Sequence, residues 1–298
     1  GMALFAVSMC VNTFLNYVLI FGKFGAPAMG VTGAAAATLA SRVVEFAVAL
    51  GYALLNKRIP LYPACILRPG RDILRRFLKY SLPVVCNETL WSTGFSLLTV
   101  IMGHMANSQD MLAAYALVGN IDKLSTVVCF GLAASAAVIV GKEIGEGRGQ
   151  TRIYAVSRTL LLASLLVGCV VRAVLLILLP TFFRPVLFPL FHLTEGAAYA
   201  ATCLCLLYAL AMPTRAFDVT NVTGVLRAGG DARVAAFIDV VPLWLAAIPL
   251  MALTALVLEA PVLVVCLSMQ AENLCKFPLG LVRFRSRRWI NDITREGQ

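Results

Sequence analysis

Residues 81–104 read SLPVVCNETLWSTGFSLLTVIMGH, an apolar stretch long enough to cross a bilayer that carries one carboxylate, Glu88, about two turns from its start. An ionised acid near mid-membrane costs about 2.5 to 3.5 kcal/mol, so such residues usually face a bundle interior or a wet cavity. Glu88 therefore predicts an inward face, which at helical spacing also carries Trp91, Ser92 and Phe95. That face suits a cation or an amphipathic molecule. The alternative is a protonated packing residue.

The composition indicates an integral membrane protein. Hydrophobic residues make up 60% of the 298 residues and charged residues 13%, whereas soluble domains are about 45 to 50% apolar and about 25% charged. The net charge of +10 does not indicate nucleic acid binding, because the basic residues lie in short gaps between apolar runs. The nine cysteines lack the spacing of metal ligands and are interpreted as small hydrophobic residues.

Eight apolar stretches long enough to cross a membrane follow one another, which predicts an all-α polytopic membrane protein with eight transmembrane helices. Turn residues or basic gaps separate them. The expected spans are residues 3–22, 34–55, 81–104, 111–141, 153–180, 197–226, 232–258 and 261–281.

The basic residues predict the orientation of these spans. Residues 56–80 are rich in lysine and arginine and are interpreted as a cytoplasmic linker, whose second part, RDILRRFLKY, is expected to lie along the membrane surface. The tail, residues 283–298, is also basic and is expected in the cytoplasm. The chain thus divides into spans at 1–55, the linker at 56–80, spans at 81–282 and the tail at 283–298, with both ends cytoplasmic.

The rise of an α-helix per residue predicts that several acids lie at a similar depth in the membrane. Counted from the cytoplasmic ends, Glu88, Asp218 and Asp239 each lie about 10 to 12 Å deep, and Glu272 and Glu45 about 13 to 15 Å deep. Several helices thus bring carboxylates to one depth. Asp239 has either a supporting or a structural role, and the sequence leaves both open.

Asp218 lies on a helix face with other oxygen-bearing side chains, Thr214 and Asn221. These are ligands of the type that a hard cation prefers. Two simpler interpretations remain open, because Arg215 is placed to neutralise Asp218 three residues away, and Lys276 is placed to neutralise Glu272 four residues away. Arg42 and Glu45 are placed to pair in the same way.

Several motifs resemble those of multidrug and toxic compound extrusion (MATE) transporters. The segment NYVLIFGKFGAPAMGVTGAAAAT, residues 16–38, resembles the fifth to sixth helices of that family. Pro83 with Asn87, Glu88 and Trp91 resembles the seventh helix. The stretch GKEIGEG, residues 141–147, resembles the end of the eighth, and GVLRAGGD, residues 224–231, the turn after the tenth. The resemblance covers nearly the whole chain.

The resemblance implies twelve spans in two six-helix lobes, in which acids on the seventh and tenth helices bind the coupling Na⁺ or H⁺. Those positions match Glu88 and Asp218 here, which would also be the metal ligands if the ion is Na⁺. Four helices would precede Ala3, so we expect an N-terminally truncated member: the last two helices of the N-terminal lobe and a complete six-helix C-terminal lobe. The missing helices would be its partners.

The expected function is that of a cation-coupled antiporter of the plasma membrane, which exports amphipathic or cationic organic compounds by alternating access. We expect no catalytic residues, no cofactor beyond Na⁺ or H⁺, and no partners beyond the organic substrate, membrane lipids and the missing helices. Residues expected to support the ion site or contact substrate are Asn87, Trp91, Ser92, Phe95, Thr214, Asn221 and Asp239.

Three other functions fit the sequence less well. A lipid-linked oligosaccharide flippase of the same superfamily is the nearest, although the acids favour drug export. An intramembrane hydrolase is disfavoured, because the sequence has only two histidines and contains neither the HExxH nor the GxSxG motif. A scaffold without transport activity would leave the buried carboxylates unexplained.

Overall fold

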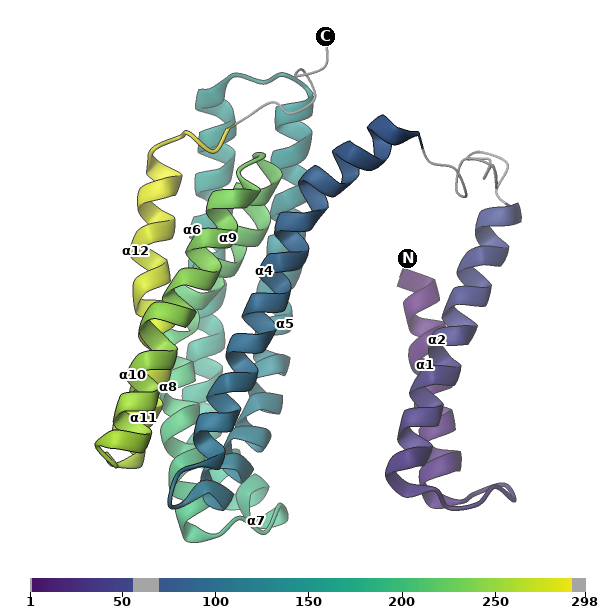
Figure 1. Ribbon diagram of the computed structural model, residues 1–298, viewed down its shortest axis with the longest axis vertical. Helices are drawn as coiled ribbons and strands as arrows, with labels where there is room; N and C mark the ends of the chain where they lie inside the picture. The colour runs from purple at the N-terminus through teal and green to yellow at the C-terminus, as the bar shows by residue number, and fades with distance from the viewer. Residues whose placement is uncertain (1, 56–69, 291–298) are drawn as a thin grey trace. The chain divides into compact units, whose positions relative to one another are not determined.

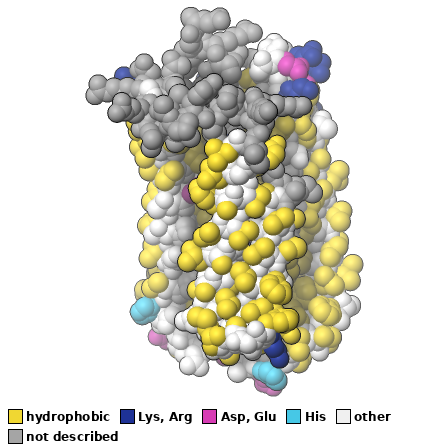
Figure 2. Space-filling view, turned by 90° about the vertical axis from the view of Figure 1, so that its right-hand side faces the viewer, with side chains coloured by type: hydrophobic (Ala, Val, Ile, Leu, Met, Phe, Trp, Pro, Cys, Tyr) yellow, Lys and Arg dark blue, Asp and Glu magenta, His cyan; other side chains and the backbone are white. Residues whose placement is uncertain are grey.

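The computed structural model describes residues 2–55 and 70–290, and the chain divides into two bodies, residues 1–75 and 76–298 (Figure 1). Within the described residues the regular structure is entirely helical, and eight segments are long and apolar enough to cross a membrane. The predicted all-α polytopic fold is confirmed. In Figure 2, apolar side chains cover the length of the visible face and most charged ones lie toward its ends, as expected of helices surrounded by lipid.

The first body is a hairpin of α1 (Met2–Phe21) and α2 (Gly30–Leu55). The two helices approach closely at Gly33, where a Cβ would lie 2.6 Å from the carbonyl oxygen of Leu19. Glu45 accepts a hydrogen bond from Ser8 Oγ at 2.8 Å and pairs with Arg42 Nη1 at 2.7 Å. The predicted pairing of Arg42 with Glu45 is therefore confirmed.

The second body holds the remaining six spans (Figure 1). Prolines interrupt several of them, and π-helical segments follow, because proline removes a backbone donor and disturbs the regular ladder. The elements are α4 (Arg71–Gly103), α5 (Ser108–Gly145), α6 (Gln150–Leu178) with η1 (Leu179–Leu187) and α7 (Phe188–Leu190), α8 (Glu195–Val219) with η2 (Thr220–Leu226), α9 (Ala232–Pro242) with η3 (Leu243–Ala247), α10 (Ile248–Ala252) and η4 (Leu253–Val257), and α11 (Val262–Met269) with α12 (Ala271–Arg285).

The helix α8 is the centre of this body. It packs against α5, α6, α11 and α12, and with η2 it is the most buried of the spans. Small side chains along it, such as Ala200, Ala209 and Ala216, are fully buried and let neighbouring helices approach. The side chains carried by α8 and η2 are therefore held among helices rather than against lipid.

Two segments outside the expected spans contain regular or packed structure. Helix α4 begins at Arg71, inside the expected linker, and runs without interruption into the span, because residues 71–82 contain neither proline nor glycine. Part of the expected tail is also packed, since Trp289 is fully buried, stacks on Phe284 at 5.9 Å and lies against Gly229. The rest of both segments, residues 56–69 and 291–298, lies outside the described residues.

We expect Gly168→Ala to destabilise the second body. A Cβ at Gly168 of α6 would lie 2.6 Å from Pro213 Cα and 2.9 Å from the carbonyl oxygen of Met212, so the α8 backbone must shift. Such overpacking costs about 1 to 3 kcal/mol. The matched control is Gly131→Ala on α5, where nothing lies within 4 Å of the added carbon. Thermal unfolding in detergent measures both, and equal midpoints would contradict the close α6–α8 packing.

Candidate cation-binding site

Asp239 of α9 is the centre of a polar cluster that joins four elements. Lys276 Nζ of α12 donates to its Oδ1 at 2.7 Å, and Asn87 Nδ2 of α4 donates to its Oδ2 at 3.2 Å. Arg227, at the end of η2, brings Nη2 to 3.8 Å from the same Oδ2. A single carboxylate thus holds together residues that are up to 189 positions apart in the chain.

Glu88 lies at the exposed edge of this cluster. Its Oε1 accepts hydrogen bonds from both Nη atoms of Arg227, each at 3.1 Å, and its side chain is 57% exposed. The packed face of α4 lies to one side of it, where Asn87, Gly94 and Leu98 are buried. Glu88 is therefore linked to Asp239 through Arg227, and its carboxylate remains open to an incoming cation.

Asp218 of α8 is placed differently from the other acids. It is 5% exposed, and neither of its carboxylate oxygens has a hydrogen-bond partner. The neighbouring Asn221 donates from Nδ2 to the carbonyl oxygen of Gly280 at 3.0 Å, while its Oδ1 and the hydroxyl of Thr220 are buried without partners. The π-helical segment η2 begins at Thr220, two residues after Asp218, and such segments are frequent at functional sites.

The two predicted coupling acids lie in one body, in α4 and α8, but the contacts of Glu88 go to Arg227 and those of Asp218 are absent in the described structure. The charges that act on Asp218 are those of Lys276, Asp239 and Glu272. Glu88 is thus joined to Asp239 through Arg227, whereas Asp218 is not joined to either by a contact in the described structure. That they share one coupling ion stays a prediction.

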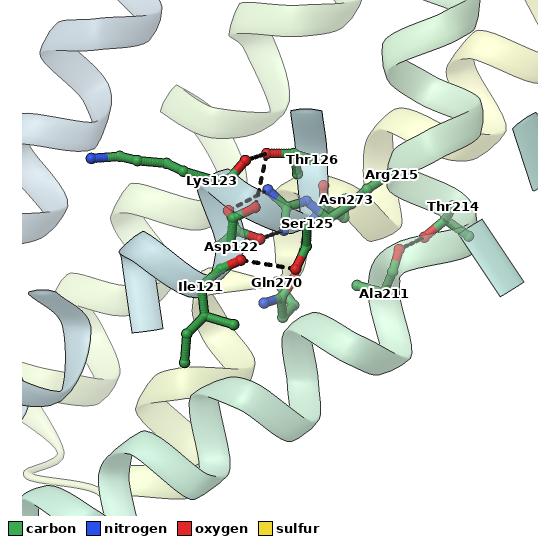
Figure 3. A network of polar contacts seen from close by, with 10 residues as sticks. All are labelled: Ile121, Asp122, Lys123, Ser125, Thr126, Ala211, Thr214, Arg215, Gln270 and Asn273. Atoms are coloured by element: carbon green, nitrogen blue, oxygen red, sulfur yellow. Dashed lines mark hydrogen bonds and ion pairs between the residues drawn. The ribbon is translucent and has the colours of Figure 1, made fainter. Parts of the chain in front are cut away.

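The remaining predicted site residues differ in their burial. Asn87 and Asn221 are buried in the cluster. Trp91 and Ser92 are exposed, and Trp91 lies beside Phe95 with ring centroids 4.5 Å apart. Thr214 is partly buried and donates to the carbonyl oxygen of Ala211 at 2.8 Å, as Figure 3 shows, so its hydroxyl is not aimed at a carboxylate.

Arg215 does not neutralise Asp218, which overturns that alternative. It forms a bidentate pair with Asp122 of α5, at 2.5 and 3.0 Å (Figure 3). Its guanidinium also lies 5.3 Å from the ring centroid of Tyr208. The pairing of Lys276 with Glu272, by contrast, is confirmed. Asp218 is thus left without a base in contact, which makes it the candidate for a bound cation.

Sequence reasoning missed Arg227 as a member of the site. In the sequence it belongs to the segment GVLRAGGD, residues 224–231, where it follows the last apolar residue of its span. A signal was available, since a long arginine side chain at a helix end reaches several ångströms back along the helix. That reach brings it to the level of Glu88.

The acids around Asp239 and Asp218 are more numerous than the bases. The carboxylates of Glu88, Asp218, Asp239 and Glu272 outnumber the bases Arg227 and Lys276 by two. No three acidic, histidine or cysteine side chains converge as a metal centre requires, within the residues that are described. A bound Na⁺ would therefore take ligands from a mixed set, one carboxylate with amide, hydroxyl or carbonyl oxygens.

Acids and bases held inside apolar spans are typical of ion-coupled membrane transporters. Comparison with known proteins gives the family. Residues 83–253 match the family model MatE, which is more than half of the chain. The chain therefore belongs to the MATE family of membrane transporters, as its motifs predicted, and it is a multi-pass membrane protein.

Its relatives carry multidrug resistance names. The chain is 27% identical to the probable multidrug resistance protein NorM of Agrobacterium fabrum, over 80% of this chain and 51% of the relative. It is 29% identical to the multidrug resistance protein MdtK of Yersinia pestis, over 87% of this chain and 56% of the relative. The chain thus spans about half the length of the curated relatives that it matches.

Solved structures show the same fold. The eukaryotic MATE transporter AtDTX14 matches with a TM-score of 0.78 at 18% identity, over 95% of this chain and 60% of that chain. The MATE transporter ClbM in complex with Rb⁺ matches with a TM-score of 0.72 at 20% identity, over 97% of this chain and 62% of that chain.

Loss of Lys276 and loss of Arg227 should lower the free energy of unfolding by different amounts. We expect Lys276→Met to cost about 3 to 5 kcal/mol, because it leaves Asp239 and Glu272 without their shared ammonium inside the bundle. Arg227→Met should cost less than about 1 kcal/mol, because its partner Glu88 is more than half exposed. Unfolding in detergent measures both variants, and equal losses would contradict the assigned burial.

Proposed function

We propose that the protein is a cation-coupled antiporter, which exports amphipathic or cationic organic compounds in exchange for Na⁺ or H⁺ by alternating access. The observation that carries the proposal is Asp218, a carboxylate inside the helix bundle whose oxygens both lack a partner. An unpaired buried charge costs several kcal/mol. A bound proton or Na⁺ removes that cost, so the site favours a cation.

The surroundings of Asp218 supply further oxygens for a cation. The Oδ1 of Asn221 and the hydroxyl of Thr220 are buried and unused by other groups in the described structure. Protons need only the carboxylate, whereas Na⁺ would use this wider set. Both ions are compatible with these residues, and no other cofactor enters the proposal.

Glu88 is the second acid of the proposed coupling pair. It is exposed where Asp218 is enclosed, and it is linked through Arg227 to Asp239, whereas Asp218 has no contact with these groups in the described structure. A cation would meet Glu88 from the open side and be held at Asp218. Trp91 and Phe95 on the same helix as Glu88 provide an aromatic surface of the kind that suits an organic cation.

The relatives support export of drugs. Two of them are named for multidrug resistance, and the ClbM structure contains Rb⁺, a monovalent cation. The excess of acids over bases in the cluster favours a cationic substrate over the anionic lipid-linked sugar of a flippase. Lipids surround the spans, and no nucleic acid partner is proposed.

We propose that the protein lies in the plasma membrane. The basic end of the second body then faces the cytoplasm. The turn between α5 and α6, the turn between α8 and α9, and the end of α12 meet there, as the contacts of Tyr154 with Phe284 and of Trp289 with Gly229 require. Basic loops of this kind remain on the cytoplasmic side. Both ends of the chain are then cytoplasmic.

We expect Glu88→Gln and Asp218→Asn each to abolish cation-driven efflux of a lipophilic cationic dye while leaving expression near the parental level. The amides keep the shape of the acids and remove their charge. The measurement is dye efflux from cells expressing the complete gene product under an imposed Na⁺ or H⁺ gradient. The control is Glu146→Gln, an acid paired with Arg148 at a helix end. Parental efflux in both variants would refute the assignment.

We also expect the 298 residues by themselves not to export dye. Alternating access requires two lobes that move around a central cavity, and the first body contributes two helices. Proteoliposomes that contain only this chain should match empty liposomes in dye efflux. Efflux driven by a cation gradient would show that the chain is sufficient or that it assembles with a second copy.

A further inference from the structure

The outward face of α6 carries a continuous apolar row. The inward face of the helix packs on α8, where a Cβ at Gly168 would meet Pro213. The outward row, called the α6 row below, has a spacing of four residues, and each member is 48 to 69% exposed: Leu162, Leu166, Val170 and Val174. It is about 18 Å long, close to the hydrocarbon thickness of one membrane leaflet, about 15 Å. The α6 row therefore suits the acyl chains of a lipid in one leaflet.

Arg158 continues the α6 row toward the basic end of the body. It precedes Leu162 by four residues, about one helical turn, and its side chain is exposed. Helix α6 contains no acidic residue, and within the described residues Arg158 has no hydrogen bond or ion pair. An arginine on a lipid-facing surface extends its guanidinium toward the membrane interface, where lipid phosphates accept its hydrogen bonds. Arg158 is thus placed to meet a lipid headgroup above the α6 row.

A second arginine is held at the same end of the row. Tyr154 precedes Arg158 by four residues on α6, and the guanidinium of Arg287 lies 4.4 Å from the centroid of the Tyr154 ring. The chain that carries Arg287 is fixed there by ring contacts, because Phe284 stacks on Tyr154 with centroids 4.9 Å apart and the buried Trp289 stacks on Phe284. Two arginines from distant parts of the sequence therefore belong to one end of the α6 row.

The acids in the neighbouring turns already have bases as partners. The pairs are Glu143 with Arg152 at 2.8 Å, Glu146 with Arg148 at 3.0 Å and Asp231 with Arg283 at 2.6 Å. Within the described residues neither Arg158 nor Arg287 forms an ion pair with a carboxylate. The charge of these two arginines is therefore not neutralised by the described protein, and it is complementary to an external anion.

We propose that this face of α6 binds an anionic glycerophospholipid, with the headgroup phosphate at Arg158 and Arg287 and the acyl chains along the α6 row. A phosphate offers the oxygen acceptors that guanidinium groups bind in pairs. A zwitterionic lipid carries the same phosphate, but its own ammonium offsets the charge, so the site discriminates lipids by net charge. The inference goes beyond the proposed function, because it involves neither the acids of the cation site nor the coupling ion.

The experiment measures lipid binding to the purified complete gene product in an uncharged detergent by native mass spectrometry. Phosphatidylglycerol and phosphatidylcholine with the same acyl chains are titrated separately, and glycerol 3-phosphate serves as a competitor that has no acyl chains. The variants are Arg158→Gln, Arg287→Gln and the two together. Arg158→Gln removes a side chain without described partners, so the fold does not depend on it. The matched control, Arg148→Gln/Arg233→Gln, removes two bases from the same end but outside the α6 row.

We expect the parental protein to bind phosphatidylglycerol more tightly than phosphatidylcholine. Each single substitution should weaken phosphatidylglycerol binding about fivefold and the double variant about 25-fold, because each base near an anionic headgroup contributes a similar free energy. The control pair should stay near the parental value. Equal binding of the two lipids, an equal loss in the control pair, or displacement by glycerol 3-phosphate at matched concentration would overturn the inference. None of these results bears on Asp218, so the proposed function is tested separately.

Discussion

A carboxylate inside an apolar helix bundle needs a base, a proton or a metal ion beside it, and the second body is arranged around that requirement. Asp239 meets it through contacts with the ammonium of Lys276, the amide of Asn87 and the guanidinium of Arg227, which lie in three other elements. These contacts tie α4, η2 and α12 to α9. A buried polar or charged group without a partner destabilises the fold. These contacts therefore fix the positions of the four elements relative to one another.

The same requirement explains why Asp218 differs from its neighbours. The base three residues before it, Arg215, turns to Asp122 on α5, where the geometry allows two hydrogen bonds. At Gly280 of α12 a Cβ would lie 2.9 Å from Asn221 Nδ2 and 3.7 Å from Asp218 Oδ1, so α12 packs closely beside the carboxylate there. The bundle thus encloses one acid without a hydrogen-bond partner among others that are paired, as the proposed cation site would require.

The packed end of the body supports the outer part of this cluster. Trp289 closes against Gly229 and stacks on Phe284, while Arg283 holds Asp231 at 2.6 Å. These contacts fix the turn that follows η2, and Arg227 begins that turn. The position of Arg227 over Glu88 therefore depends on residues from the end of the chain, which carry no sequence signal of a role in ion binding.

The sequence by itself determined the spans, the family and the pairs within one helix, such as Arg42 with Glu45 and Lys276 with Glu272, because length, apolar composition and helical spacing are local properties. It also singled out Glu88 and Asp218, although it left open a packing role for Glu88 and neutralisation of Asp218 by Arg215. Only the tertiary structure decided which base meets which acid across helices, so that Arg227 pairs with Glu88. The rotation and packing of each helix set those contacts, and residues distant in the sequence determine them.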